Sequence, residues 1–185
     1  MKVLLVNGSP HKNGNTAAAL KIVEQELQAA GLETDWFKLG TGPVNGCLAC
    51  GGCSKTHRCV NRKDGCNELI EKMLLADGVI IGSPVYFAGP NGALTALLDR
   101  AFYAASNYGQ LFKGKPAAAV VSVWREGGTA AIDRLNKYFT FAQMPIVSSD
   151  YWNVYMGSQD EYGKEVLKHL GVNFAELLHE KVQKR

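Results

Sequence analysis

Residues 2–16, KVLLVNGSPHKNGNT, decide the fold of this chain. Residues 3–6 form an unbroken apolar run, which is typical of a strand buried on both faces of a parallel sheet. Turn-forming residues 7–10 end this strand, and a helix pattern begins at Thr16. A strand, a loop of small residues and a helix N-terminus together indicate an anion site, because free backbone N–H groups and the helix dipole point to one place.

The loop excludes two common nucleotide motifs. A Walker A loop requires a lysine directly before Ser or Thr, whereas Asn15 precedes Thr16 here. Gly8 and Gly14 do not fit G-x-G-x-x-G, and the second predicted strand ends in Leu-Gly-Thr-Gly (39–42) instead of an acid for a ribose hydroxyl. A terminal phosphate monoester such as that of FMN, held by hydroxyls, an amide and backbone N–H groups without a metal, fits the loop. The alternative is an ordinary polar loop in which Asn15 only caps the helix.

The composition is that of a globular protein. Of 185 residues, 46% are hydrophobic and 20% are charged, and the net charge of +3 is too small to indicate nucleic-acid binding. The sequence shows no secretory signal pattern and no apolar run of the ~18–20 residues that a membrane span requires. All five cysteines fall between Cys47 and Cys66, which favours reduced thiols or metal ligands over disulfides. We therefore expect a cytoplasmic protein without membrane or nucleic-acid partners.

Apolar periodicity predicts that strands and helices alternate along the chain. The strands are expected at residues 3–6, 33–39, 78–82, 116–123 and 145–148, with residues 151–156 as an extension or an extra edge strand. The helices are expected at residues 16–30, 67–76, 90–102, 129–139 and 161–182. Within them we expect Pro90 in a first turn, Thr129 as an N-cap and Gly171 as a kink or break.

Five strands that alternate with helices form a parallel sheet with helices on both faces and right-handed crossovers. Ligands of such sheets bind beyond the carboxyl ends of the strands, where the strand order switches. The exit loops at residues 8–16, 83–89 and 124–129 should therefore converge. The chain shows no internal repeat and no linker, so we expect one domain over residues 1–185, with a long Gly- and Cys-rich loop inserted at residues 40–66.

The second and third exit loops carry flat apolar side chains beside backbone polar groups. Pro84, Tyr86 and Phe87 lie in the second loop, and the third contains Trp124 and a Gly-Gly pair. Apolar walls with hydrogen-bonding groups at their edges suit a flavin ring. The alternative is that Tyr86 and Phe87 are core residues at the end of a strand.

Two motifs carry a family resemblance: GSPHKNGNT at residues 8–16 and GSPVYFAGPNGALTALLDR at residues 82–100. Together with the five-strand pattern, they resemble the NAD(P)H-dependent FMN reductase branch of the flavodoxin-like superfamily, over nearly the whole chain. The resemblance implies a flavodoxin-like three-layer α/β sandwich with a five-stranded parallel sheet in the order 2-1-3-4-5. It also implies FMN as cofactor, NAD(P)H as substrate and a homodimer or homotetramer.

The resemblance further implies a set of cofactor-binding residues. The FMN phosphate would be held by Ser9, Asn15 and Thr16, with His11 and Asn13 in the variable part of the loop. The isoalloxazine ring would be bordered by Pro84, Val85, Tyr86, Phe87, Gly127 and Gly128. No catalytic side chain is expected, because the cofactor carries out the chemistry.

The sequence CLACGGCSKTHRC at residues 47–59 places four cysteines at the spacing C-x2-C-x2-C-x5-C. These are Cys47, Cys50, Cys53 and Cys59. Neighbouring glycines allow tight turns, and four thiolates can bind a 4Fe–4S cluster. The spacing resembles the compact motif of iron–sulfur flavoproteins, a subgroup of the same family in which this loop also follows the second strand. A structural zinc site and four free cysteines are the alternatives.

We therefore expect an FMN-dependent oxidoreductase that accepts hydride from NAD(P)H and passes electrons to a quinone, a flavin or an iron–sulfur acceptor. The alternative function is an iron–sulfur flavoprotein electron carrier that exchanges electrons with ferredoxin and has no small-molecule substrate. A nucleotide-responsive binding module would hold its ligand without changing redox state, and the cysteines argue against it.

Overall fold

The apolar run near the N-terminus forms strand β1 (Lys2–Asn7). In the computed structural model, which describes residues 1–183, β1 pairs in parallel with β2 (Glu33–Lys38) on one side and β3 (Gly78–Tyr86) on the other. Residues 3–6 are buried because helices cover both faces of the sheet. The prediction of a doubly covered strand is therefore confirmed.

The sheet continues from β3 to β5 (Ala117–Ser122) and then to β6 (Val154–Tyr155), all in parallel. Its order is β2-β1-β3-β5-β6. The two-residue strand β4 (Gly89–Pro90) lies off this path and pairs with β3 in antiparallel orientation. Counted without β4, the five parallel strands follow the order 2-1-3-4-5, which confirms the predicted flavodoxin-like topology.

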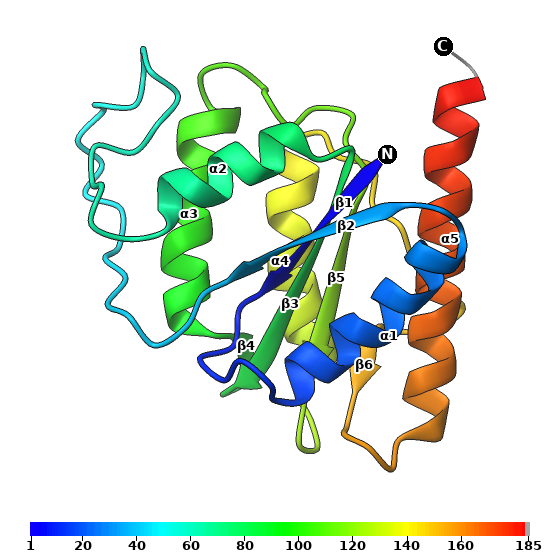
Figure 1. Ribbon diagram of the computed structural model, residues 1–185. Helices are drawn as coiled ribbons and strands as arrows, with labels where there is room; N and C mark the ends of the chain where they lie inside the picture. Colours follow the sequence, from blue (N-terminus) through cyan, green and yellow to red (C-terminus); the bar gives the residue numbers. More distant parts are fainter. Residues whose placement is uncertain (184–185) are drawn as a thin grey trace.

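The helices form one layer on each face of the sheet (Figure 1). One layer contains α1 (Asn15–Ala29) and α5 (Glu161–Gln183). The other layer contains α2 (Cys66–Leu75), α3 (Gly92–Ser106) and α4 (Gly128–Phe141). Within residues 1–183, none of the helices combines the length and the apolar character that crossing a membrane requires.

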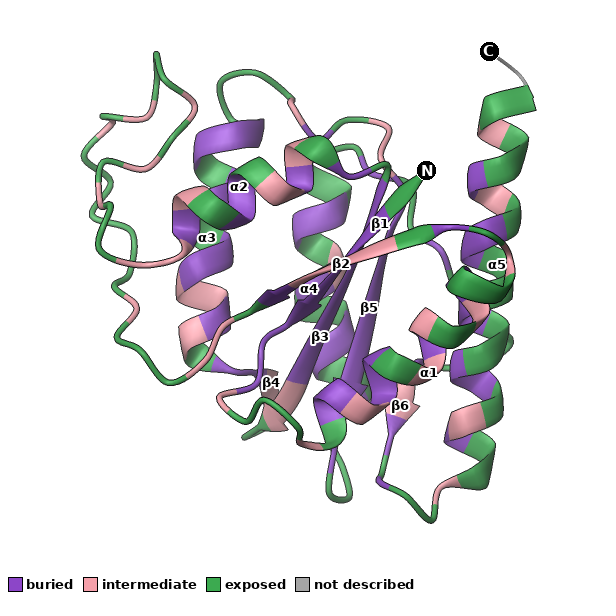
Figure 2. Cartoon of the chain, in the orientation of Figure 1, coloured by how far each residue is buried: buried purple, intermediate pink, exposed green. Residues whose placement is uncertain are grey.

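Two apolar cores lie between these layers, one on each side of the sheet. Successive side chains of a strand point to opposite faces, so Leu4 and Val6 join the core beneath α2, α3 and α4. Val3 and Leu5 join the core beneath α1 and α5. Figure 2 shows the consequence: the central strands and the inner helix faces are buried, and the outer helix faces are exposed.

Strand β3 is longer than the sequence predicts. The prediction ended this strand at Gly82, but β3 runs to Tyr86, and the chain then folds back into β4. Pro90 lies in β4 and not in the first turn of α3, so that prediction is wrong. Instead, the side chain of Asn91 caps α3 by accepting a hydrogen bond of 2.8 Å from the backbone N–H of Ala93.

Three further predictions about element ends are wrong. The N-cap of α4 is Gly127 and not Thr129, because the helix already begins at Gly128. Residues 145–148 form no strand, since only Ile146 makes an isolated bridge, to Ala117; the fifth parallel strand is β6, within residues 151–156. Gly171 does not break α5, which is continuous from Glu161 to Gln183.

The close packing of α5 against α1 explains why position 171 is a glycine. A Cβ at this position would lie 2.6 Å from Cβ of Glu26 and 3.0 Å from the carbonyl oxygen of Val23. Glycine is therefore required here by the approach of two helices. Its effect on helix propensity is secondary, because tertiary packing overrides a difference of about 1 kcal/mol.

The predicted insertion is a long irregular connection. Residues 39–65 join β2 to α2 without a helix or strand and lie outside α2 and α3 (Figure 1). Four of its side chains, Leu39, Val44, Cys53 and Cys59, pack against the core on this side of the sheet. The cysteine motif is thus fixed to the body of the protein at its later positions.

Candidate functional site

The loop after β1 holds Ser9 in a defined position. The backbone N–H of Ser9 donates to Oδ1 of Asn7 at 3.1 Å, and the backbone N–H of His11 donates to Oγ of Ser9 at 3.1 Å. Ser9 is buried, whereas His11 and Asn13 are exposed at the tip of the loop. The hydroxyl of Ser9 therefore accepts one bond within the loop and keeps its own hydrogen for a ligand.

The start of α1 leaves backbone donors available. Its N-cap is Gly14, and no side chain caps the first turn. The alternative in which Asn15 only caps this helix is therefore wrong: Asn15 is exposed and lies inside the helix. The hydroxyl of Thr16 is buried and bonds to the hydroxyl of Ser122 at 2.7 Å, which fixes the loop to the end of β5.

The β3–β4 hairpin presents aromatic side chains at the same edge of the sheet. Pro84 and Val85 are half-buried, Tyr86 is exposed and Phe87 is fully exposed, so the core interpretation of the two aromatic residues is wrong. Phe87 and Ala88 have φ values of 49° and 59°, in the left-handed region that side chains other than glycine rarely adopt. Such strain is typical of functional loops.

Close contacts bring the exit loops together as predicted. The backbone N–H of Gly8 donates to the carbonyl of Gly82 at 2.8 Å, which joins the first loop to β3 just before the second loop. Gly127 has a φ of 85°, and a Cβ there would lie 2.7 Å from Cα of Ala88, so the third loop lies directly against the hairpin. A Cβ at Gly128 would lie 2.9 Å from Cγ2 of Val154 in β6. Trp124 in the third loop is exposed.

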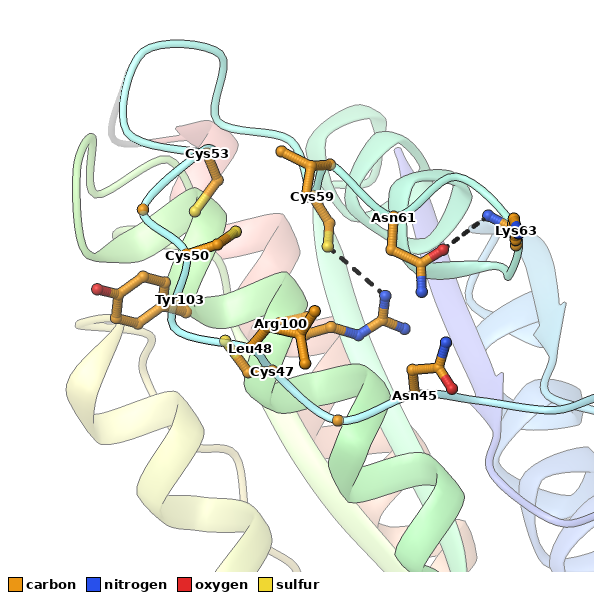
Figure 3. Close-up of a pocket in the computed structure, with 13 residues that line it drawn as sticks. Asn45, Cys47, Leu48, Cys50, Cys53, Cys59, Asn61, Lys63, Arg100 and Tyr103 are labelled. Atoms are coloured by element: carbon orange, nitrogen blue, oxygen red, sulfur yellow. Dashed lines mark hydrogen bonds between the residues drawn. The ribbon is translucent and has the colours of Figure 1, made fainter.

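The four motif cysteines line a second site, away from these loops. A cavity of about 490 Å³ lies between the long loop and α3, and Figure 3 shows the residues that line it. Its wall includes Cys47, Cys50, Cys53 and Cys59 from the loop, with Arg100 and Tyr103 from α3. Cys66 is buried at the start of α2 and lies outside this lining, and its burial raises the pKa of its thiol to about 12.

Cys59 is the most firmly held of the four. Its backbone N–H donates to Oδ1 of Asn67 at 2.8 Å, and Nδ2 of Asn67 donates to its carbonyl oxygen at 2.9 Å. Nη1 of Arg100 donates to its sulfur at 3.5 Å (Figure 3). Nη2 of Arg100 also pairs with the buried carboxylate of Asp64 at 2.5 Å.

Sequence reasoning missed these three supporting residues. Arg100 carries a signal that could have found it, because it lies in an apolar helix pattern, three residues after Leu97 and four before Ala104. A charge on that face must be paired in the interior. Its partner Asp64 is 36 positions away, and no local pattern indicates it.

The thiols share a cavity without converging on one point. Within residues 1–183, no three His, Cys, Asp or Glu side chains lie close enough together to bind one metal ion. Cys47 and Cys50 are exposed. The pKa of the Cys53 thiol is raised, first by its partial burial and then by repulsion from the neighbouring thiolates. The chemistry of the donor set suits a metal group bound by four thiolates, and such binding requires the loop to draw the sulfurs together.

Comparison with known proteins agrees with the fold. The family of NADPH-dependent FMN reductases matches residues 1–159. An iron–sulfur flavoprotein of Methanocaldococcus jannaschii is 30% identical over 96% of this chain and 97% of its own length. Another, of Methanosarcina thermophila, is 34% identical over 69% of this chain and 66% of its own length.

Two solved structures show the same fold at low identity. The flavoenzyme NAD(P)H:(acceptor) oxidoreductase of Paracoccus denitrificans has a TM-score of 0.73 at 16% identity, over 97% of each chain. An archaeal flavodoxin has a TM-score of 0.67 at 15% identity, over 97% of this chain and 99% of its own. Since the family match spans most of the chain and a relative at 30% identity spans nearly all of it, this protein belongs to the NADPH-dependent FMN reductase family.

Proposed function

We propose that this protein is an FMN-dependent oxidoreductase that takes hydride from NAD(P)H. The observation that carries the proposal is the loop after β1, where the first turn of α1 has no side-chain cap and the hydroxyls of Ser9 and Thr16 flank it. Free N–H groups at a helix N-terminus bind a phosphate without a metal. Family membership and the convergence of three exit loops support FMN as the phosphate ester.

The same edge of the sheet provides a seat for the isoalloxazine ring. The backbone of residues 84–87 and the Gly127–Gly128 pair border this seat. Asn15 lies close to Gly157, since its Nδ2 would be 3.7 Å from a Cβ built on that glycine. Bound FMN would supply the hydride-accepting chemistry. The residues of the chain bind the phosphate, orient the ring and leave one side of it open through the exposed hairpin tip at Phe87.

We further propose that Cys47, Cys50, Cys53 and Cys59 hold a 4Fe–4S cluster that receives electrons from the flavin. Their location on one cavity supports the proposal, as do relatives that bear the name iron–sulfur flavoprotein. Asn67 holds the backbone of Cys59, which orients its sulfur toward the cavity. A zinc ion on the same thiolates, or no metal, is the competing outcome of the metal assay.

A second candidate function is an electron carrier without a small-molecule substrate. Cys47 and Cys50 are exposed, so a cluster bound there would lie at the surface, where a partner protein could exchange electrons with it. This function and the first share both cofactors. They differ in whether a reduced nicotinamide alone can reduce the flavin.

Mixing the FMN-loaded protein with NADH, and separately with NADPH, without oxygen tests this difference. We expect the visible absorbance of the flavin to bleach with at least one of them. Dithionite is the control, because it should reduce the flavin in either case. Bleaching by dithionite but by neither nicotinamide would contradict the reductase function and favour the electron carrier.

The phosphate loop is tested in the same preparation by the variant S9A. Hydrogen bonds to charged groups contribute about 1.5–3 kcal/mol, so loss of the Ser9 hydroxyl should weaken FMN binding at least tenfold. The variant S54A removes a hydroxyl from an exposed serine of the long loop and should leave FMN affinity unchanged. Equal affinity of S9A and the unmodified protein would exclude Ser9 from the phosphate site.

A further inference from the structure

Arg100 is a buried cation in the wall of the cysteine cavity, and neither FMN binding nor metal ligation gives it a role. Its side chain is 3% exposed, on the inner side of α3. Figure 3 shows its guanidinium directed into the cavity, beside the sulfur of Cys59. A buried guanidinium gives up its hydration, so it persists only where acceptors in the interior compensate for that loss.

The donors of Arg100 are only partly used. Nη2 pairs with Asp64, whose carboxylate is 5% exposed, and Nη1 donates to the sulfur of Cys59. Nε is buried and has no hydrogen-bond partner among the described residues. Because a buried N–H without an acceptor is unfavourable, its presence at a cavity wall indicates a ligand that completes it. The guanidinium favours an anionic ligand, and the four cysteines of the same wall suit a metal–sulfur group.

We propose that Arg100 is a positioning residue that raises the reduction potential of an iron–sulfur cluster held by the four cysteines. This inference rests on the proposed function. The guanidinium would donate to the Cys59 sulfur through Nη1 and to a second sulfur in the cavity through Nε. A cluster with four thiolate ligands carries net negative charge, and hydrogen bonds and positive charge near its sulfurs stabilise the reduced form.

The redox step itself is simple. One-electron reduction adds one negative charge to the cluster and neither forms nor breaks a bond there. The electron comes from reduced FMN in the proposed function and from dithionite in a titration. A nearby cation lowers the free energy of the more negative state and therefore raises the potential.

Asp64 should affect the reduction potential of the cluster in the direction opposite to that of Arg100. Its carboxylate accepts from Nη2 of Arg100 at 2.5 Å and from the backbone N–H of Cys66 at 3.3 Å, which anchors it at the start of α2. It offsets part of the charge of Arg100. Removing the charge of Asp64 should therefore raise the potential, whereas removing the charge of Arg100 should lower it.

Potentiometric titration of anaerobically purified protein tests the proposal, with iron, sulfide and melting temperature measured on each sample. We expect R100M to lower the cluster potential enough to change the ratio of reduced to oxidised cluster at least tenfold, about 59 mV for a one-electron couple. R100K keeps the charge but not the planar fork and should recover part of this shift. D64N should shift the potential upward.

The matched control is R62M, which removes an exposed cation from the same loop, three residues from Cys59. Its charge is screened by water, so the potential should move much less than in R100M. Equal cluster potentials for R100M, D64N and the unmodified protein at full iron content would overturn the role of Arg100 but would leave the cluster itself in place. A lower melting temperature at unchanged potential would mean a purely structural role and would overturn it as well.

Two further outcomes are decisive. If R100M fails to fold, R100K and D64N still test the proposal, because their predicted shifts have opposite signs. Absence of both iron and sulfide from the unmodified protein would refute the cluster itself, and the role of Arg100 with it.

Discussion

At the residue scale, Gly127 is where the third exit loop meets the β3–β4 hairpin. Its φ of 85° lies in the left-handed region, and a Cβ would lie 2.7 Å from Cα of Ala88. Two separate constraints therefore require glycine here, one conformational and one steric. A contact with backbone atoms cannot be relieved by moving a flexible side chain.

The variant G127A should separate these loops and weaken FMN binding at least tenfold, in addition to destabilising the protein by about 1–3 kcal/mol. G31A is the matched control. Gly31 has a φ of 78° and no atom within 4 Å of a built Cβ, so it carries the conformational cost without the steric contact. Fluorescence titration with FMN and thermal unfolding measure both effects. Equal loss of FMN affinity in the two variants would show that the contact with Ala88 does not shape the site.

Residue-scale prediction from sequence succeeds where the signal is local. Ser9 and Thr16 flank a recognisable loop between a strand and a helix, so the sequence alone identified them as candidates. The partners that hold the sites were not predictable in this way. Ser122 is 106 positions from Thr16, and Asp64 is 36 positions from Arg100; only the folded sheet brings each pair together.

At the element scale, β1, β2 and β5 were predicted to within one residue at each end, whereas the end of β3 and the position of β6 were not. β1 and β5 are buried on both faces, and their composition shows it. β3 extends beyond Gly82 because residues 83–84 continue the pairing with β5 and residues 85–86 pair with β4. A hairpin of this size has almost no sequence periodicity. β6 has two residues, so its position depends on tertiary pairing with β5.

The packing of α5 on α1 supports a prediction about Gly171. Alanine is a better helix former than glycine by about 1 kcal/mol, but a Cβ at Gly171 would lie 2.6 Å from Cβ of Glu26. Overpacking of this kind costs about 1–3 kcal/mol. We therefore expect G171A to lower the free energy of unfolding, as measured by urea denaturation.

The variant G92A is the control, because Gly92 is a helical glycine without close neighbours. Gly92 begins α3 and has open space around a built Cβ, so alanine there should be neutral or stabilise by up to about 1 kcal/mol. If G171A were as stable as G92A, the two helices would not be in the close contact described above.

At the scale of the whole molecule, the chain combines two candidate sites on one sheet. The exit loops of the parallel strands form one site at the carboxyl edge, and residues 39–65 form the other against α2 and α3 (Figure 1). Arg100 belongs to α3, whose N-terminus directly follows the β3–β4 hairpin of the first site. A single helix therefore connects the proposed flavin seat to the wall of the cysteine cavity.

The central claim is that one chain holds both FMN and an iron–sulfur cluster. The measurement that tests it most directly is the content of FMN, iron and acid-labile sulfide in protein purified without oxygen, for the unmodified chain and for C47S, C50S and C66A. We predict about one FMN and about four iron and four sulfide per unmodified chain. C47S and C50S should lose most iron and sulfide but keep FMN, whereas C66A should keep all three, because Cys66 lies outside the cavity lining. Full iron and sulfide in C47S and C50S, or FMN with neither in the unmodified chain, would contradict the account.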